Sequence, residues 1–283
     1  MQHRQHTRLS YHLLASALSY PGDDARALFA WSVRATVHGM LSHESYLRQA
    51  AQPQAYRLGD DRMQRQMSIL GDLDANAVAD LMQTATGPAQ FTLRWNGYNQ
   101  LAPLGVSTRL CSNDTNDNTR DDAAQQTNPS RQGLDISGHA TEGLREQVMA
   151  ACLDYLQTKN ALAAERSDRH LLENLDRLGL QEQALRDVCL YLYEEPWADL
   201  PASAKKLACS SRSLQRALHQ AGLGFAGLRM AIRLNLVSAA IRRGENSLTG
   251  IAHAAGFYDA AHLDHSWKQA TGINPSQYRQ LLA

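Results

Sequence analysis

One short segment, residues 210–222, carries the signals of a complete helix. Ser210 can cap the N-terminus of this helix, and Gly222 can end it. Between them, apolar and polar side chains fall on opposite helical faces. The apolar face has Leu214, Ala217 and Leu218, and the polar face has Arg212, Gln215, Arg216 and His219. The spacing predicts a helix of about three turns with one buried face and one face free for a partner.

The polar face holds side chains that can recognise base pairs in the DNA major groove. Arginine can bond O6 and N7 of guanine together, and glutamine can bond N6 and N7 of adenine. Polar stripes also occur on ordinary solvated helices, so the face by itself fits either role.

The distribution of charge favours a polyanion partner. The chain is neutral, with 28 basic and 28 acidic residues, yet residues 200–244 contain eight Lys and Arg and no Asp or Glu. Residues 184–283 hold 11 basic and 7 acidic residues (net +4), whereas residues 1–183 hold 17 and 21 (net −4). A basic module in a neutral protein is the pattern expected of a nucleic-acid-binding domain.

The region from about residue 184 to residue 279 resembles the double helix-turn-helix domain of AraC/XylS-type bacterial transcription regulators. The matching residues occur in the family's order, through a first unit, a connecting helix, a second unit and a closing signature. They are Leu200, Ala204, Leu207, Ser210–Arg216, Arg233-Leu234-Asn235, Ile251-Ala252, Ala255-Gly256-Phe257, Leu263, Gly272, Pro275 and Tyr278-Arg279. The resemblance implies an activator that binds promoter or operator DNA in successive major grooves and contacts RNA polymerase.

We predict that the first unit supplies most of the affinity and the base recognition. Arg212, Gln215 and Arg216 are the candidates for base contacts. Further candidates, several of them for phosphates, are Ser211, Ser213, His219, Lys205, Lys206, Arg229 and Arg242.

The second unit has a less basic recognition helix, predicted from Ala260 to Ala270. Its outward candidates are Ala260, Ala261, Asp264, His265 and Lys268, with Leu263 and Trp267 inward. DNA phosphates repel a carboxylate, and residues 245–283 carry a net charge of −1. We expect this unit to contribute phosphate and shape contacts or a docking surface. The competing interpretation is that Asp264 is a surface residue with no role in DNA binding.

The N-terminal region, residues 1–110, is predicted to be a regulatory or sensing domain that is α-rich or α+β. Helices are expected at 9–20, from Asp23 or Asp24 towards Leu41, at 62–70 and at 76–82. The alternation from Phe91 to Trp95, followed by Asn96-Gly97, predicts a strand and a hairpin turn, and residues 105–110 predict another strand. The effector of this region is either a small molecule or a protein.

Two segments connect this region to residues 181–283, the predicted DNA-binding domain. Residues 111–140 are almost devoid of apolar side chains and are predicted to be a flexible linker. Residues 141–180 contain two amphipathic patterns, one starting at Thr141 and one running from Ala161 to Leu178. These helices form either a homodimer interface or a cover for the N-terminal core.

Motifs of other functional classes are missing from the sequence. The chain has no G-x-S-x-G, H-E-x-x-H or G-x-x-x-x-G-K-[ST] motif, so we expect no enzyme. Its four cysteines lie far apart, which predicts neither a disulfide framework nor a metal site, and no cofactor is implied. Cys189 and Cys209 are expected to be small buried residues. No apolar run reaches the roughly 18 residues that span a bilayer.

The sequence therefore predicts a mainly α-helical, cytoplasmic, sequence-specific transcription regulator with an all-α C-terminal domain. The alternative is an interaction protein whose degenerate DNA-binding domain mainly recruits a partner.

Overall fold

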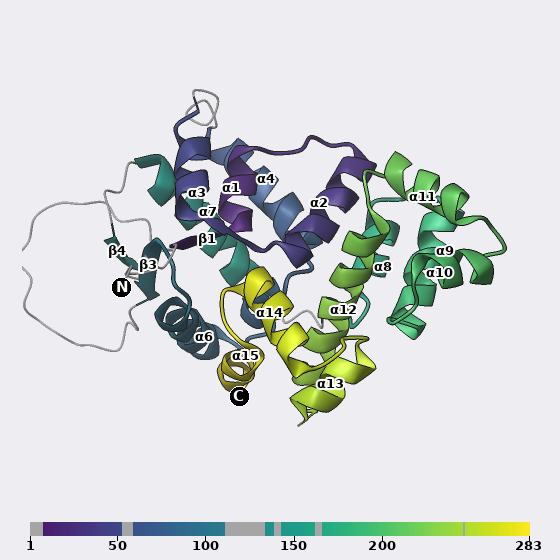
Figure 1. Ribbon diagram of the computed structural model, residues 1–283. Coiled ribbons are helices and arrows are strands. Elements are labelled where there is room, and N and C mark those ends of the chain that lie inside the picture. The colour runs from purple at the N-terminus through teal and green to yellow at the C-terminus, as the bar shows by residue number, and fades with distance from the viewer. Residues whose placement is uncertain (1–7, 53–58, 111–133, 139–142, 162–165, 246) are drawn as a thin grey trace, which may run out of the picture.

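The computed structural model describes residues 8–52, 59–110, 134–138, 143–161, 166–245 and 247–283. Helices dominate these residues, so the prediction of a mainly α-helical protein is confirmed (Figure 1). The N-terminal elements are β1 (Leu9–Tyr11), α1 (His12–Leu18), α2 (Ala25–Val37), β2 (Met40–Ser42), α3 (His43–Ala50), α4 (Asp60–Leu73), α5 (Ala77–Gln83), α6 (Pro88–Leu101), β3 (Val106–Leu110), β4 (Leu134–Gly138), α7 (Gly143–Ala161) and α8 (His170–Arg177). The C-terminal elements are α9 (Gln183–Glu194), α10 (Leu200–Lys206), α11 (Ser211–Gln220), α12 (Phe225–Arg242), α13 (Leu248–Ala254), α14 (Ala260–Thr271) and α15 (Pro275–Leu282).

The described strands form two small antiparallel sheets. Strand β1 pairs with β2, with Leu9 opposite Ser42. Strand β3 pairs with β4, with Val106 opposite Gly138. The strand expected at residues 105–110 is thus present as β3. Its partner β4 lies inside the segment predicted to be a linker, and the rest of that segment, 111–133 and 139–140, falls outside the described residues.

The strand and hairpin turn predicted at residues 91–97 are wrong, because this segment lies inside helix α6. Pro88 stands at the first turn, where its fixed φ suits a helix. Phe91, Trp95 and Tyr98 then follow at helical spacing and are all buried. The Asn96 side chain bonds the backbone of Leu110 on β3 in both directions. Burial of this aromatic face outweighs the local turn signal.

Other N-terminal boundaries differ from the predictions by a few residues. The helix expected at 9–20 begins as strand β1, and the helix expected to reach Leu41 ends at Val37 because β2 follows. Within the helix expected from Ala161 to Leu178, Ala161 ends α7 and His170–Arg177 forms α8; residues 166–169 are described and not helical, and residues 162–165 lie outside the described residues. The two helices expected at 62–70 and 76–82 correspond to α4 and α5.

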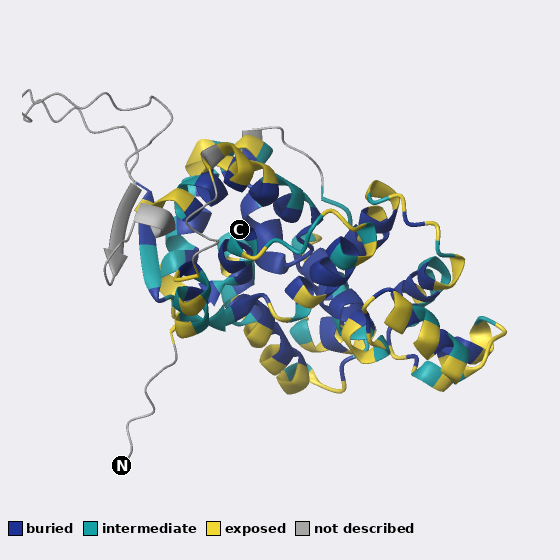
Figure 2. Ribbon diagram, turned by 90° about the horizontal axis from the view of Figure 1, so that it is seen from above, coloured by how far each residue is buried: buried dark blue, intermediate teal, exposed yellow. Residues whose placement is uncertain are grey.

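Two hydrophobic cores each combine residues of the N-terminal and C-terminal regions. One joins Leu13, Met67 and Phe91 to Trp267 of α14 and Tyr278 of α15. The other joins α2 and α8 to the inner faces of α9, α11 and α12. Helix α2 lies beside α12 in the middle of the molecule (Figure 1), and the buried residues run through both regions (Figure 2). An isolated C-terminal fragment would therefore expose surface that is buried in the whole chain.

The two helices of residues 141–180 turn their apolar faces into these cores. Val148 and Tyr155 of α7 are buried against the N-terminal helices. Leu171 and Leu175 of α8 are buried beside α2 and α9. Of the two roles left open for this segment, these contacts support cover for the core.

No single helix among the described residues is both long and apolar enough to cross a membrane. Helices α11 and α12 taken together are long and apolar enough to span a membrane, but they are bent by 76° relative to each other. The inner residues of both, Leu218 and Leu228 among them, are buried in the chain's own core.

Candidate DNA-binding surface

Helices α10 and α11 are the pair predicted to form the first helix-turn-helix unit, and side chains cap both. Asp199 accepts a hydrogen bond from the backbone N–H of Ala202 at 2.8 Å, and Ser210 accepts one from the N–H of Ser213 at 3.0 Å. The predicted cap at Ser210 is thus present, and the turn at Gly222 has a φ of +70°. Each cap satisfies a backbone donor that the helix leaves open.

The outer face of α11 is exposed as the spacing predicts. Leu214 and Leu218 are buried, whereas Arg212, Gln215, Arg216 and His219 are exposed. Within the part of the chain that the structure describes, these four side chains make no hydrogen bond, ion pair or cation–π contact. This face is therefore free to receive a ligand without breaking an internal contact.

The other candidate residues of the first unit differ in how far they are exposed and in whether they contact neighbouring side chains. Lys205 and Lys206 are exposed at the end of α10, and the Lys206 ammonium lies 6.0 Å from the Tyr191 ring centre. Ser211 and Ser213 are half-buried, and the Ser213 hydroxyl lies 2.9 Å from that of Ser210.

Two arginines proposed for phosphates already have partners within the chain. Arg229 donates to the Ala198 carbonyl at 3.0 Å. Arg242 pairs with Asp80 at 3.1 Å and Asp168 at 2.7 Å, and it also donates to the Arg166 carbonyl at 2.8 Å. Contact between Arg242 and DNA would require it to leave these partners.

Helices α13 and α14 are the pair predicted to form the second unit, and Ser247 and Asp259 cap them. Leu263 and Trp267 of α14 point into the core, as expected. The proposed outer residues are all exposed except Ala260, which is half-buried; they are Ala260, Ala261, Asp264, His265 and Lys268. This outer face is less basic than that of α11.

The connection between the helices differs between the two units. In the first unit, Ala208 has a φ of +51°, a conformation that strains an L side chain. In the second, Gly256 holds the corresponding place with a φ of +80°. A Cβ on Gly256 would lie 2.8 Å from the Pro196 carbonyl carbon and oxygen, so this turn packs directly on the loop that precedes α10. Arg233 of α12 reinforces the junction by donating to the Pro196 carbonyl at 2.8 Å, and burial lowers its pKa to about 10.

Comparison with family models gives a match to a helix-turn-helix domain over residues 203–281. These residues contain most of α10 and all of α11 to α14, the elements that form the two units. The C-terminal region is an AraC-type helix-turn-helix domain. Domains of this type occur in DNA-binding transcription regulators, and the resemblance seen in the sequence is confirmed.

Comparison with solved structures finds more distant likenesses. ToxT from Vibrio cholerae O395 is 14% identical with a TM-score of 0.35, and the alignment covers 53% of this chain and 61% of ToxT. The transcriptional regulator CdpR from Pseudomonas aeruginosa is 14% identical with a TM-score of 0.32, over 83% of this chain and 94% of CdpR. This chain thus spans less than two thirds of ToxT, and no curated protein matches it.

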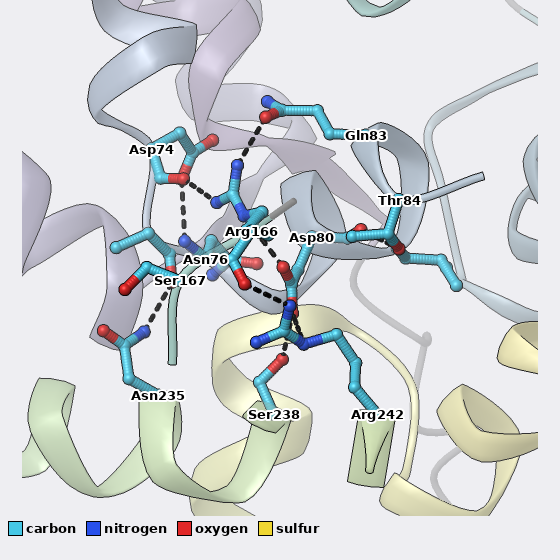
Figure 3. A network of polar contacts seen from close by, with 12 residues as sticks. Asp74, Asn76, Asp80, Gln83, Thr84, Arg166, Ser167, Asn235, Ser238 and Arg242 are labelled. Atoms are coloured by element: carbon cyan, nitrogen blue, oxygen red, sulfur yellow. Dashed lines mark hydrogen bonds and ion pairs between the residues drawn. The ribbon is translucent and has the colours of Figure 1, made fainter. Parts of the chain in front are cut away.

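The AraC-type domain is joined to the N-terminal region by a network of polar contacts that the sequence did not reveal (Figure 3). Asp80 of α5 pairs with Arg166 at 2.8 Å and with Arg242 at 3.1 Å, and it accepts a hydrogen bond from Ser238 at 2.5 Å. Asn235 of α12 donates to the Ala75 carbonyl at 2.8 Å. Asp80, Asn235 and Ser238 are buried, so their polar groups depend on these partners to replace water.

Side chains at the start of α5 and on α6 also hold the C-terminal end of α14. The Asn76 side chain donates to the Ala270 carbonyl at 3.0 Å, and the Tyr98 hydroxyl donates to the Thr271 carbonyl at 2.9 Å. Two of the carbonyls that a helix leaves open at its C-terminus are satisfied in this way. Nearby Asp74 is buried, which by itself would raise its pKa, but His12, Tyr11 and the Asn76 N–H lower it.

The cysteines divide between buried and exposed positions. Cys152 and Cys189 are buried, and burial raises the pKa of each thiol to about 12. Cys209 is exposed, so its expected burial is wrong: it follows the left-handed Ala208 and stands in the turn before α11. Among the described residues, no group of three His, Cys, Asp or Glu side chains is placed to hold a metal ion.

Proposed function

We propose that the protein is a sequence-specific transcription regulator in which α11 reads base pairs in one major groove and α14 enters the next, about 34 Å away along the DNA. The observation that carries this proposal is the outer face of α11. Two arginines and one glutamine are exposed and have no partner among the described residues, on a helix that its caps and core hold in place. Such side chains can each make paired hydrogen bonds to one base.

The first unit is the dominant reader in this proposal. The outer face of α14 presents Asp264 and His265 where α11 presents arginines, and a carboxylate near phosphates weakens binding. Lys268 of α14 and Lys205 and Lys206 of α10 suit phosphate contacts, which position a protein on DNA without reading its sequence. The second unit therefore adds orientation and shape recognition.

The remaining assignments follow from the resemblance of the C-terminal motifs to those of AraC-type regulators. In this proposal the protein is a non-enzymatic activator in the cytoplasm that contacts RNA polymerase at promoters. The N-terminal region receives an effector that adjusts DNA binding.

A selection of random duplexes by the full-length chain tests the proposal. The full chain is needed because both cores combine N-terminal and C-terminal residues. We expect one sharp half-site and, one helical turn away, a loosely defined one. Titration of the selected duplex at two salt concentrations should give a steep loss of affinity, with a log–log slope near −0.9 for each phosphate contacted.

Two other outcomes would change the proposal. Two equally sharp half-sites would mean that Asp264 and His265 read bases and that the first unit is not dominant. Absence of any enriched duplex would contradict DNA recognition itself.

A second candidate function is recruitment of a protein partner, and one observation favours it. Trp197 is 59% exposed and Tyr258 is 85% exposed, and they stand on the two loops that pack together at Gly256. Exposed aromatic side chains are common at protein interfaces. If this function holds, Trp197→Ala together with Tyr258→Ala should abolish capture of a partner and leave any DNA binding unchanged.

A further inference from the structure

A cavity of about 80 Å³ lies inside the N-terminal region, away from the DNA-binding surface. Its walls come from β1, β3 and the helices α1, α3, α5, α6 and α7. Aromatic and sulfur-containing side chains supply much of the lining, including Tyr46, Met82, Trp95 and Met149. Methionine adapts its shape readily, so these walls can close around ligands of differing outline.

The hydroxyl, amide and indole groups in the lining are already engaged with other protein groups. The Thr108 hydroxyl accepts from the Trp95 indole at 3.0 Å and lies 3.1 Å from the Asn99 side-chain oxygen. The Ser10 hydroxyl lies 2.9 Å from a His43 ring nitrogen. Burial raises the pKa of the Cys152 thiol to about 12, so this group is neutral. Among the lining residues, Glu146 is the one charged side chain, and it is exposed.

This chemistry selects an apolar ligand. A sugar or an ion would lose its hydrogen bonds to water and find few free partners in the cavity, which is costly. An apolar molecule would gain by leaving water and by contact with the aromatic walls.

Helix α5 forms one wall of the cavity and also touches the AraC-type domain. Val78, Ala79 and Met82 line the cavity. Asp80, on the same short helix, binds Ser238 and Arg242 of α12. Asn76, which caps this helix, donates to the Ala270 carbonyl at the end of α14. A displacement of α5 therefore reaches α12 and α14 without passing through a loop.

Helix α6 makes the same kind of connection through one residue. The Tyr98 ring lines the cavity, while its hydroxyl donates to the Thr271 carbonyl of α14 at 2.9 Å. The Met40 sulfur lies 3.5 Å from that hydroxyl, and its Cε would lie 3.3 Å from a Cβ built on Gly272. Met40 thus stands between the cavity wall and the end of the second recognition helix.

We propose that this cavity binds a small apolar, preferably aromatic, molecule and that binding is coupled through Asn76 and Tyr98 to the C-terminal end of α14. In this proposal the ligand binds preferentially to the conformation in which both donors hold α14, and its binding therefore stabilises that conformation. The effect on transcriptional control rests on the proposed DNA-binding function, whereas occupancy of the cavity does not.

Methyl NMR of the methionines in the full-length chain, with toluene as the probe, tests occupancy. The Met82 and Met149 signals should shift in a saturable way, whereas Met230 on α12 should not. Glucose at the same concentration should shift none of them. Ala79→Leu and, separately, Leu14→Phe place larger side chains in the cavity, and a folded variant of either kind should lose the Met82 and Met149 shifts. Unchanged Met82 and Met149 signals in the wild type would overturn the proposed site.

Coupling is tested with Tyr98→Phe, which keeps the aromatic wall and removes the donor to Thr271. In the wild type, toluene should also shift the Met40 signal and change the affinity for the selected duplex about fivefold or more. In Tyr98→Phe, the Met82 and Met149 shifts should persist, while the Met40 shift and the change in affinity should fall by at least half. Asn76→Ala alone should move the affinity in the direction opposite to toluene.

The readouts separate failure of the inference from failure of the proposed function. Occupancy with no shift at Met40 and no change in affinity overturns the coupling and leaves DNA recognition intact. Occupancy with a Met40 shift in a protein that selects no duplex overturns the proposed function and supports the coupling between cavity and α14.

Discussion

The two recognition helices of this protein share a motif but differ in what surrounds them. Helix α11 presents Arg212 and Arg216 to solvent, and it packs mainly on α10 of its own unit and on α9. Helix α14 presents Asp264 on its outer face, and it packs on α2, α5 and β2 of the N-terminal region. Helix α11 thus has an outer face open to solvent, whereas contacts with the N-terminal region hold α14.

The turns of the two units follow the same division. In the first unit, Ala208 keeps a side chain at a left-handed position, with a φ of +51°. In the second unit, the Pro196 backbone approaches so closely that only glycine fits at position 256. Close packing against Pro196 therefore constrains the second turn.

The largest expected effect comes from removing the Asp80 carboxylate, which holds Arg166 and Arg242 at the junction of the N-terminal and C-terminal regions. Asp80→Ala leaves Arg166 and Arg242 without their shared carboxylate in a buried site, which should cost about 3–5 kcal/mol in the free energy of unfolding. Urea denaturation measures it. Asp176→Ala, which removes the exposed partner of Arg186 near the first unit, is the matched control and should leave the urea midpoint unchanged. Equal losses of stability in Asp80→Ala and Asp176→Ala would show that the buried contacts of Asp80 do not hold the fold more strongly than the exposed ion pair of Asp176.

The next effect concerns DNA rather than stability. Arg216→Ala on α11 should cost about 1–3 kcal/mol of binding to the selected duplex and relax specificity at one base pair. Lys268→Ala on α14 should weaken all duplexes by a similar small factor, because it removes one phosphate contact. Fluorescence anisotropy with the selected duplex and single-base variants measures both. A sharper loss of specificity in Lys268→Ala than in Arg216→Ala would reverse the proposed roles.

Two smaller changes in stability, of opposite sign, are expected from substitutions in the turns at Gly256 and Ala208. Gly256→Ala should destabilise the protein by about 1–2 kcal/mol, because its Cβ meets the Pro196 backbone and its φ is positive. Ala208→Gly relieves a left-handed alanine and should stabilise the protein by up to about 1 kcal/mol. Thermal melting at neutral pH compares them. If both glycine–alanine exchanges change stability in the same direction, the two turns do not differ as described.

The smallest expected effect is a change in the free energy of unfolding as the pH falls below neutrality, and it comes from His170. His170 opens α8, and its pKa lies well below the ordinary value because burial and the nearby Arg166 and Arg177 disfavour its charged form. The unfolded chain therefore binds more protons than the folded chain below about pH 6.5, so stability falls as pH drops through that value. Between pH 7.5 and 6 the loss should be roughly 1 kcal/mol or less. Urea denaturation of His170→Leu should lack this part of the pH dependence.

Local signals correctly predicted the helix, the cap and the exposed face of the candidate DNA-binding surface. Capping residues, glycine stops and helical spacing act over a few residues, and they placed Ser210, Leu214 and the exposed face of α11 correctly. The same signals failed at residues 91–97, where an alternating pattern and an Asn-Gly pair suggested a hairpin. Packing of Phe91, Trp95 and Tyr98 decided that segment, and a pattern of five residues does not contain that information.

The sequence by itself determined the C-terminal helices, their caps, the faces they bury and the segregation of basic charge. Each of these properties depends on neighbours within a few turns of the chain. Only the tertiary structure decided that Arg242 binds Asp80 rather than solvent, and that Asn76 reaches Ala270, 194 residues away. It also decided that α5 and α6 shape a cavity on one side and hold α14 on the other. Such contacts arise when distant segments exclude water together, and no local periodicity records which segments will meet.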